Sequence, residues 1–457
     1  MARREALLRH PLAIAGALIT TASAVVFLAL LIAMLAGLLQ NPYAGLVVFI
    51  AIPAFFVAGL VLIPIGVRLQ RRKLVRDPSA ADWPVLDFRD PTVRRTGLLI
   101  AALTGVNVVI MLLAGYGTLH WMESPTFCGQ ACHAPMHPQF TAWQQASHAR
   151  VACASCHIGE GASGFVYAKM SGVRQLVQVA TNSYPRPIPS GAHMRPGAQA
   201  KTCMGCHEPG RASGDHIRVI REYADDEKNA ETITVLQMHL SPSPASKRAI
   251  HWHADPAVRV EYVSTDAERQ TIPYVRVTDA KGNVKEYRTA DGTDQKISGG
   301  ARATMDCVDC HNTVGHPISQ TPERAVDDAI AATRVSRALP FARREGVRVL
   351  KESYPSQDEG LRTIDRELRK FFDSAGGSAD PAGVSQTVAA FQDIYRHNVF
   401  PAMKVTWGAY RTNKGHLTST GCFRCHDDEH KAPDGSAINA DCEYCHKQIE
   451  QPNTGTK

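Results

Sequence analysis

The chain has 457 residues, of which 44% are hydrophobic and 20% charged, and its formal net charge is +7. This composition excludes an intrinsically disordered chain and leaves room for two or three domains. The first 97 residues hold eleven Lys and Arg against five Asp and Glu, whereas the rest of the chain holds 39 against 38. A basic nucleic-acid-binding face on the large C-terminal part is therefore excluded.

Three apolar segments near the N-terminus predict a membrane anchor. They cover residues 11–39, 44–67 and 98–119, and each has the about 20 residues that a helix needs to cross a bilayer. Basic residues precede the first segment and fill the connection 68–97, which the positive-inside rule places in the cytoplasm together with the N-terminus. Three spans then deliver everything after His120 to the periplasm.

A cleaved signal peptide is the alternative interpretation of the first segment. Ala22-Ser23-Ala24 has the small-residue pattern of a cleavage site. Cleavage there would leave residues 25–39 as an apolar overhang, so the membrane span is the preferred interpretation.

All twelve cysteines occur in pairs that are followed directly by a histidine. Five pairs have the C-x-x-C-H spacing of covalent c-type haem attachment, and the first, CGQACH, has one extra residue. Zinc binding or chance does not explain six motifs that use every cysteine, so the sequence predicts a cytochrome with six covalently bound haem c groups. In chain order, the motifs are Cys128/Cys132-His133, Cys153/Cys156-His157, Cys203/Cys206-His207, Cys307/Cys310-His311, Cys422/Cys425-His426 and Cys442/Cys445-His446.

The position of the motifs agrees with the charge pattern. Haem is attached to such motifs outside the cytoplasm, and all six follow the third apolar segment. The sequence therefore predicts a bacterial inner-membrane protein with a periplasmic haem domain. Roughly 56 residues are available per haem, too few for separate pockets, so the haems must pack together and form much of the core.

The predicted fold is three transmembrane helices followed by a mainly α-helical and irregular haem-packed domain with a small β insert. The strands are expected at 232–238, 258–263 and in a hairpin of 271–278 with 284–288. The predicted domains are an anchor (1–120) with its basic loop, a region with haems 1–3 (121–210), a β-rich insert (211–300), haem 4 with a helical segment (301–415), and haems 5–6 (416–457).

Helices are predicted between the fourth and fifth motifs. Thr321 resembles a helix N-cap, with proline at the first helical position. Leu361, Ile364, Leu368 and Phe371 fall on one helical face. Residues 374–383 are expected to form a loop, and a further helix is expected around 386–397.

Histidines outside the motifs are candidates for the second axial ligand. A relay haem is usually closed by two ligands, whereas a catalytic haem keeps one iron position open. Twelve further histidines lie on the external side, which is enough to close six haems. His251 and His253 lie two apart and would point the same way on a strand. The preferred candidates are His148, His216, His251, His253, His316, His416 and His430, and the weaker ones are His137, His193, His239 and His397.

Residues 127–160 resemble the first two haem sites of the NapC/NirT/NrfH family of membrane-anchored quinol-oxidising cytochromes. The likeness consists of a first motif closely followed by Met136 and a proline, an Ala-Trp segment, a Ser-His pair and the second motif. Lys169-Met-Ser-Gly-Val-Arg and the third motif extend it loosely to residue 210. IHWH at 250–253 and GCFRCHDDEH at 421–430 resemble the larger NapC/NirT-type inner-membrane cytochromes of metal-respiring bacteria.

The resemblance implies a quinol site beside haem 1. Family members place a methionine at the offset of Met136 on the iron, so either Met136 or His133 is the ligand here, and an unligated His133 could take the proton. Lys169 matches the family's quinol-site lysine. No acidic residue stands between Glu160 and Glu208, so Glu123, Glu160 and His133 are the candidate proton acceptors.

The sequence is compatible with three functions. The leading one is oxidation of menaquinol at the periplasmic face near haem 1, with electrons relayed to a periplasmic cytochrome or reductase in anaerobic or extracellular respiration. The alternatives are a wiring subunit of a larger quinone-linked complex and a haem reductase of a small nitrogen or sulfur species. Family members usually have one span and four or five haems, so the resemblance does not account for three spans and six motifs.

Overall fold

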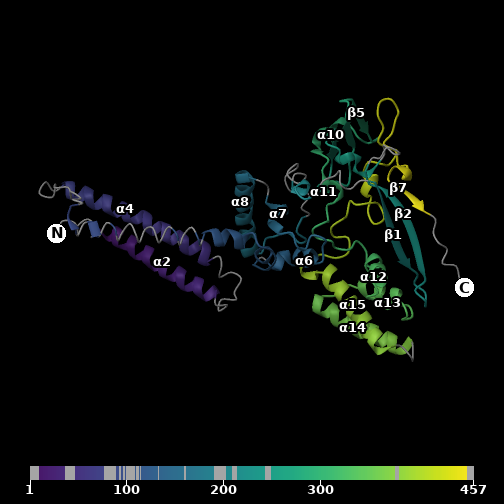
Figure 1. The fold of residues 1–457 in the computed structure, drawn as a ribbon, viewed down its shortest axis with the longest axis horizontal. Helices are drawn as coiled ribbons and strands as arrows, with labels where there is room; N and C mark the ends of the chain where they lie inside the picture. Colours follow the sequence, from purple (N-terminus) through teal and green to yellow (C-terminus); the bar gives the residue numbers. More distant parts are fainter. Residues whose placement is uncertain are drawn as a thin grey trace. The chain divides into compact units, whose positions relative to one another are not determined.

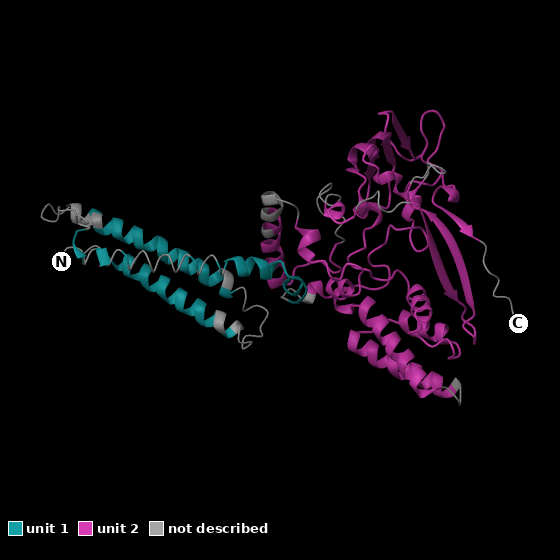
Figure 2. Ribbon diagram, in the orientation of Figure 1, with its two compact units in different colours: residues 1–133 teal, residues 134–457 magenta. Residues whose placement is uncertain are grey.

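The structure is a computed structural model whose chain divides into two compact units, residues 1–133 and 134–457 (Figure 2). It describes residues 10–35, 47–76, 89–91, 94, 95, 98, 109, 113, 115–131, 133–158, 161–189, 202–207, 214–241, 249–375 and 380–449.

The first unit is built on two long apolar helices, α2 (Pro11–Leu35) and α4 (Ile52–Arg76), the second entered through a π-helical turn, η1 (Val47–Ala51) (Figure 1). Within the described residues, these two helices are long and apolar enough to cross a membrane. They confirm the first two predicted segments as apolar helices. The third predicted segment, 98–119, lies mostly outside the described residues, although residues 115–122 are helical.

Small residues allow α2 and α4 to pack with their backbones close together. A Cβ atom on Gly16 would lie 2.7 Å from the carbonyl oxygen of Gly59, and one on Gly66 would lie 2.4 Å from the backbone nitrogen of Ala13. Such glycine contacts are typical of helices that associate inside a bilayer. Leu18 and Phe55 are exposed on the outside of the pair, where lipid would meet them.

The N-terminal part of the haem region is a series of short helices. A π-helical turn, η3 (Phe127–Ala131), leads to α6 (His133–Gln144), α7 (Cys153–His157) and α8 (Gly161–Ala180). The indole Nε1 of Trp143 donates to the carbonyl oxygens of His148 and Val151, each at 3.1 Å. This tryptophan therefore ties the end of α6 to the loop that enters the second motif.

Two antiparallel sheets form the β component. The first has the order β1-β2-β7, so the last strand of the described chain pairs with a strand from its middle, and the second has the order β5-β4-β3-β6. The strands predicted at 232–238 and 258–263 and the predicted hairpin are confirmed; β1, β6 and β7 were not predicted. The strands are β1 (Asp215–Tyr223), β2 (Glu231–His239), β3 (Arg259–Ser264), β4 (Tyr274–Thr278), β5 (Val284–Arg288), β6 (Ala301–Thr304) and β7 (His446–Ile449).

The segment between the two sheets corrects the idea that His251 and His253 lie on a strand. It forms a 3-10 helix, η6 (Ile250–Ala254). Side chains two apart on a helix point in different directions, unlike those on a strand. The two histidines can therefore serve two different sites.

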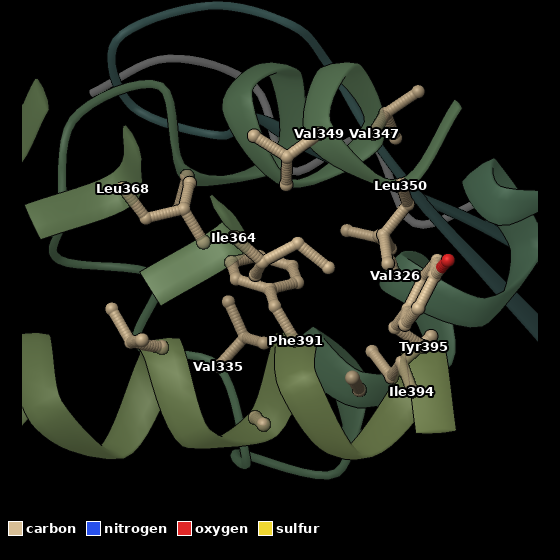
Figure 3. Close-up of a cluster of buried hydrophobic side chains, with 14 of the residues drawn as sticks. Val326, Val335, Val347, Val349, Leu350, Ile364, Leu368, Phe391, Ile394 and Tyr395 are labelled. Atoms are coloured by element: carbon tan, nitrogen blue, oxygen red, sulfur yellow. The ribbon is translucent and has the colours of Figure 1, made fainter. Parts of the chain in front are cut away.

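A helical bundle without any cysteine follows the fourth motif. Phe391 of α15 packs against Ile364 of α14 and Val335 in a continuous apolar core (Figure 3). The helices of the bundle are α12 (Pro322–Ala331), α13 (Ala342–Lys351), α14 (Gln357–Ala375) and α15 (Pro381–Asn398). The short helices α10 (Asp294–Gly299) and α11 (Cys307–Cys310) come before it, and the 3-10 turns η7 (Pro401–Met403), η8 (Gly421–Arg424) and η9 (Cys442–Tyr444) come after it.

The ends of these helices follow the predictions closely. The Thr321 side chain accepts a hydrogen bond from the backbone nitrogen of Arg324, as expected of an N-cap. The loop expected at 374–383 is shorter than predicted, because Asp380 accepts from the backbone nitrogens of Ala382 and Gly383 and starts α15 early.

Candidate haem-ligating site

Five of the six motif histidines lie beside a second histidine from another part of the chain. An imidazole–metal bond is about 2 Å long and the ring centre lies roughly 1 Å further, so two rings that share one iron have centres about 6 Å apart. The observed spacing fits one iron between the members of each pair. The centroid distances are 5.9 Å for His157–His316, 5.9 Å for His207–His148, 6.4 Å for His311–His251, 5.9 Å for His426–His253 and 6.0 Å for His446–His416.

The protonation state of these rings suits metal binding. Burial, together with a smaller contribution from the neighbouring His157, lowers the pKa of His316 to about 4. Burial likewise lowers the pKa of His157, His251, His253, His311 and His446. These imidazoles are therefore neutral at pH 7, the form that carries a free lone pair for iron.

Backbone carbonyls orient one of the pairs. The Nδ1 of His253 donates to the carbonyl oxygen of Ile250 at 2.9 Å, and the Nδ1 of His426 donates to that of Asn439 at 3.0 Å. A hydrogen bond at Nδ1 fixes the tautomer and leaves Nε2 for the metal. Both rings of this pair are thus prepared for coordination through Nε2.

The attachment cysteines of motifs 2, 3 and 4 lie near one another. Burial raises the pKa of the Cys156 thiol, and Cys153 and then Cys206 raise it further because like charges would lie close together. Burial also raises the pKa of Cys203, and the nearby Cys307 side chain partly offsets this rise. Motif 3 is therefore close to both motif 2 and motif 4.

The same relation continues through motifs 4, 5 and 6. Burial raises the pKa of the Cys310 thiol to about 11, with a further contribution from Cys422. Burial raises the pKa of Cys445 to about 11, again with a contribution from Cys422. Motif 5 is therefore close to both motif 4 and motif 6.

Two of the preferred second-ligand candidates do not face a motif histidine. His430 is buried, its Nδ1 lies 2.9 Å from each carboxylate oxygen of Asp427, and its Nε2 donates to the carbonyl oxygen of Ile272 at 2.6 Å. Both of its ring nitrogens are engaged, so the structure does not support the prediction that His430 binds iron. His216 is exposed on β1 and lies beside no motif histidine in the described structure.

The weaker candidates have other contacts. The ring of His137 meets Phe400 edge-on at 5.2 Å, and the Nδ1 of His239 lies 2.8 Å from an oxygen of Asp215. The Nδ1 of His397 donates to the carbonyl oxygen of Asp393 at 2.7 Å, whereas His193 lies outside the described residues.

The predicted quinol site is described only in part. Met136 is half-buried on α6, three positions after His133, and Glu123 is half-buried before the first motif. Glu160, Cys132 and the side chains of His133 and Lys169 lie outside the described part of the chain. The choice between His133 and Met136, and the role of Lys169, therefore stay predictions.

Attachment motifs whose histidines each lie beside a second histidine, as motifs 2 to 6 do here, are typical of a multihaem c-type cytochrome. Residues 91–208 match the model of the NapC/NirT cytochrome c family, N-terminal region. The chain is 36% identical over 456 residues to the cytochrome c-type protein ImcH of Geobacter sulfurreducens, an alignment that covers 97% of this chain and 88% of that protein. No solved structure matches the chain.

The chain therefore belongs to the NapC/NirT family of c-type cytochromes. This membership confirms the resemblance of residues 127–160 and with it a membrane-anchored electron-transfer protein that carries covalently bound haem c.

Proposed function

We propose that the chain is an inner-membrane hexahaem cytochrome that oxidises menaquinol at the periplasmic face, near motif 1, and relays the electrons to a periplasmic acceptor. The observation that carries this proposal is the set of five histidine pairs beside motifs 2 to 6. The haem that these residues would hold supplies a one-electron redox centre. An iron with both axial positions taken transfers electrons but binds no substrate.

The arrangement of the cysteines supports a relay. Cys203 lies close to Cys307, and Cys422 lies close to both Cys310 and Cys445. Each motif from 2 to 6 is thus next to its predecessor. Short steps between neighbouring redox centres are what a relay requires.

We assign the entry of electrons to motif 1 because its cysteine spacing and the methionine that follows it differ from those of the other motifs. Met136 stands where the family's methionine ligand is expected, and the motif follows the apolar N-terminal segments directly in the chain. The half-buried Glu123 lies five positions before Cys128 and is the described candidate to accept a quinol proton. Lys169 and His133 complete the proposed quinol site.

The proposed topology has three spans, with the N-terminus and the loop 68–97 in the cytoplasm. The basic loop and the two apolar helices support it, and an odd number of spans places the motifs in the periplasm. Alkaline phosphatase is active only outside the cytoplasm. A fusion after residue 80 should therefore be inactive, whereas a fusion after residue 120 should be active. Activity at both junctions would contradict three spans.

The test of the function is anaerobic mixing of the purified full chain, in detergent, with a menaquinol analogue while the haem α-band is followed. Rapid, inhibitor-sensitive reduction of several haems is expected. Met136→Leu should slow this reduction, whereas the matched His216→Ala, at an exposed histidine that forms none of the five pairs, should not. Full reduction by dithionite without reduction by quinol would overturn quinol oxidation and favour a wiring subunit.

A reductase of small nitrogen or sulfur species would need an open iron. With the proposed second histidines bound, motifs 2 to 6 would have no open iron position, so such an activity could use motif 1 alone. A high-spin signal that changes on addition of nitrite would support that activity, and its absence would exclude it.

A further inference from the structure

A buried charged cluster joins the fourth and fifth motifs. It is formed by Asp309, inside Cys307-Val-Asp-Cys-His, by Arg424, inside Cys422-Phe-Arg-Cys-His, and by Arg269 and Tyr262 from the second sheet and its loop. Asp309 is 3% exposed and Arg424 is 8% exposed. Charged residues this deeply buried are rare unless they have partners or a function.

The carboxylate of Asp309 is fully partnered. Its Oδ1 accepts from the Tyr262 hydroxyl at 2.5 Å and from Arg269 Nη1 at 2.7 Å, and its Oδ2 accepts from the backbone nitrogen of Asp306 at 2.7 Å. Burial raises the pKa of Tyr262, which therefore remains a neutral donor at pH 7. The negative charge of Asp309 is thus balanced by Arg269.

The guanidinium of Arg424 is held by backbone carbonyls alone. Its Nε donates to Gly421 at 2.9 Å, its Nη1 to Arg269 at 2.9 Å and its Nη2 to Asp309 at 2.7 Å. Among the ion pairs of the described residues, none includes Arg424. Arginine stays protonated at any pH a protein survives, so one positive charge is left without a carboxylate partner.

This charge lies beside the attachment points of two haems. Arg424 directly precedes Cys425 in the chain, and its Nη2 donates to the carbonyl oxygen of Asp309, which directly precedes Cys310. Screening by salt is weak at a buried site, and a charge interaction is several times stronger there than in water. Reduction adds one electron to a haem, and a nearby cation favours that change.

We propose that Arg424 sets the reduction potentials of the haems on motifs 4 and 5, and makes these two haems the preferred positions for electrons within the relay. The hydrogen bond from Arg424 to the Asp309 carbonyl also joins the two attachment segments, so one side chain contacts both. The proposal rests on haem attachment and not on quinol oxidation.

The test is a redox titration of the full chain in detergent, with mediators and dithionite as the electron source and the α-band as the signal. Arg424→Gln should make the midpoint potentials of two haems more negative. The equilibrium constant for reduction of each of these haems should fall by about tenfold or more. Arg424→Lys keeps the positive charge, so its midpoint potentials should stay near those of the unchanged protein. Quinol takes no part, so the result is independent of the proposed function.

Two further variants separate charge from disruption. Tyr262→Phe removes a hydrogen bond from the same cluster without changing its charge and should leave the midpoints in place. Arg259→Gln removes an exposed charge from the same sheet and should also have no effect. Unchanged midpoints in Arg424→Gln at full haem content, or equal shifts in Arg424→Gln and Tyr262→Phe, would overturn the proposal.

Discussion

The helical bundle α12–α15 and the motif-bearing segments of the same unit are held together in different ways. The bundle has a continuous core in which Ile364, Leu368 and Phe391 are completely buried (Figure 3). By contrast, the short helices that carry motifs 2 and 6, α7 and η9, contain no buried residue. The bundle is stabilised by apolar packing, whereas the segments of motifs 2 and 6 would depend on the proposed thioether bonds and axial histidines.

This difference explains which region each kind of substitution should affect. A cavity in the bundle should lower stability without changing haem coordination. Loss of an axial histidine should change coordination with a smaller effect on the bundle. The following experiments test that separation, from the largest expected effect to the smallest.

Phe391→Ala should have the largest effect on stability. It removes a fully buried ring from the centre of the bundle core, a change that typically costs about 3–5 kcal/mol. Chemical denaturation followed by far-UV circular dichroism should show the loss, while the haem spectrum of the folded protein stays unchanged. Lys370→Ala, at an exposed position of α14, should change the free energy of unfolding only slightly. A changed haem spectrum in Phe391→Ala would show that the two regions are not separate.

His316→Ala should open one iron and leave the bundle intact. Since His316 faces His157, about one sixth of the haem should become high-spin or take up a solvent ligand. Electron paramagnetic resonance and cyanide binding measure this change. His216→Ala is the matched control, because His216 is exposed and faces no motif histidine. If His316→Ala remained fully low-spin, the pairing of His157 with His316 would be wrong.

Asp380→Ala should weaken the bundle moderately. Asp380 caps α15 by accepting from the backbone nitrogens of Ala382 and Gly383, and loss of an N-cap costs about 1 kcal/mol. Asp380→Asn should keep most of the stability, since asparagine caps nearly as well. Equal losses in the two variants, measured by denaturation, would argue against capping as the cause.

The smallest effect is expected at Glu231, which links the β1–β2 hairpin to the loop after α12. Burial raises the pKa of Glu231, but hydrogen bonds from Arg221 and Tyr223 outweigh it and leave this pKa below its usual value. The Arg337 guanidinium also lies 3.1 Å from this carboxylate. A carboxyl group whose pKa is lowered by folding stabilises the protein above its unfolded pKa, and this contribution is lost as the pH falls through the folded pKa.

Glu231→Gln should therefore be less stable than the unchanged protein at pH 7, with a difference that shrinks as the pH falls below about 4. Thermal unfolding at a series of pH values measures it. Glu222→Gln, at an exposed position of β1, serves as the control. A difference that did not depend on pH would rule out titration of Glu231 as its source.

The fold was predictable wherever the chain has a periodic pattern. Leu361 and Leu368 mark a helical face, and the hairpin strands have β-rich sequences around a polar turn, so both were predicted correctly. The strand β7 was not predicted, because its four residues His446–Ile449 overlap the sixth motif and gain strand structure only by pairing with β2. Such pairing is a property of the fold rather than of the local sequence.

The site was predictable in its attachment residues but not in its pairing. The cysteine spacing identifies six motif histidines, whereas the partner of each depends on which loops meet. His430 follows the fifth motif by four residues and resembled a ligand, but Asp427 and Ile272 hold its ring. Asp309 and Arg424 lie between the two cysteines of their motifs, at positions where the C-x-x-C-H pattern allows any residue. The pattern alone therefore does not predict a role for their charges.

The pairing of His157 with His316 has a consequence for biosynthesis. A chain exported from its N-terminus delivers His148 before motif 3, and His251 and His253 before motifs 4 and 5. His316, however, follows motif 4, so in the proposed topology and pairing motif 2 would meet its partner only after two further motifs had crossed the membrane. The thioether bonds proposed at Cys153 and Cys156 would then hold that haem during export, whereas axial ligands alone would not.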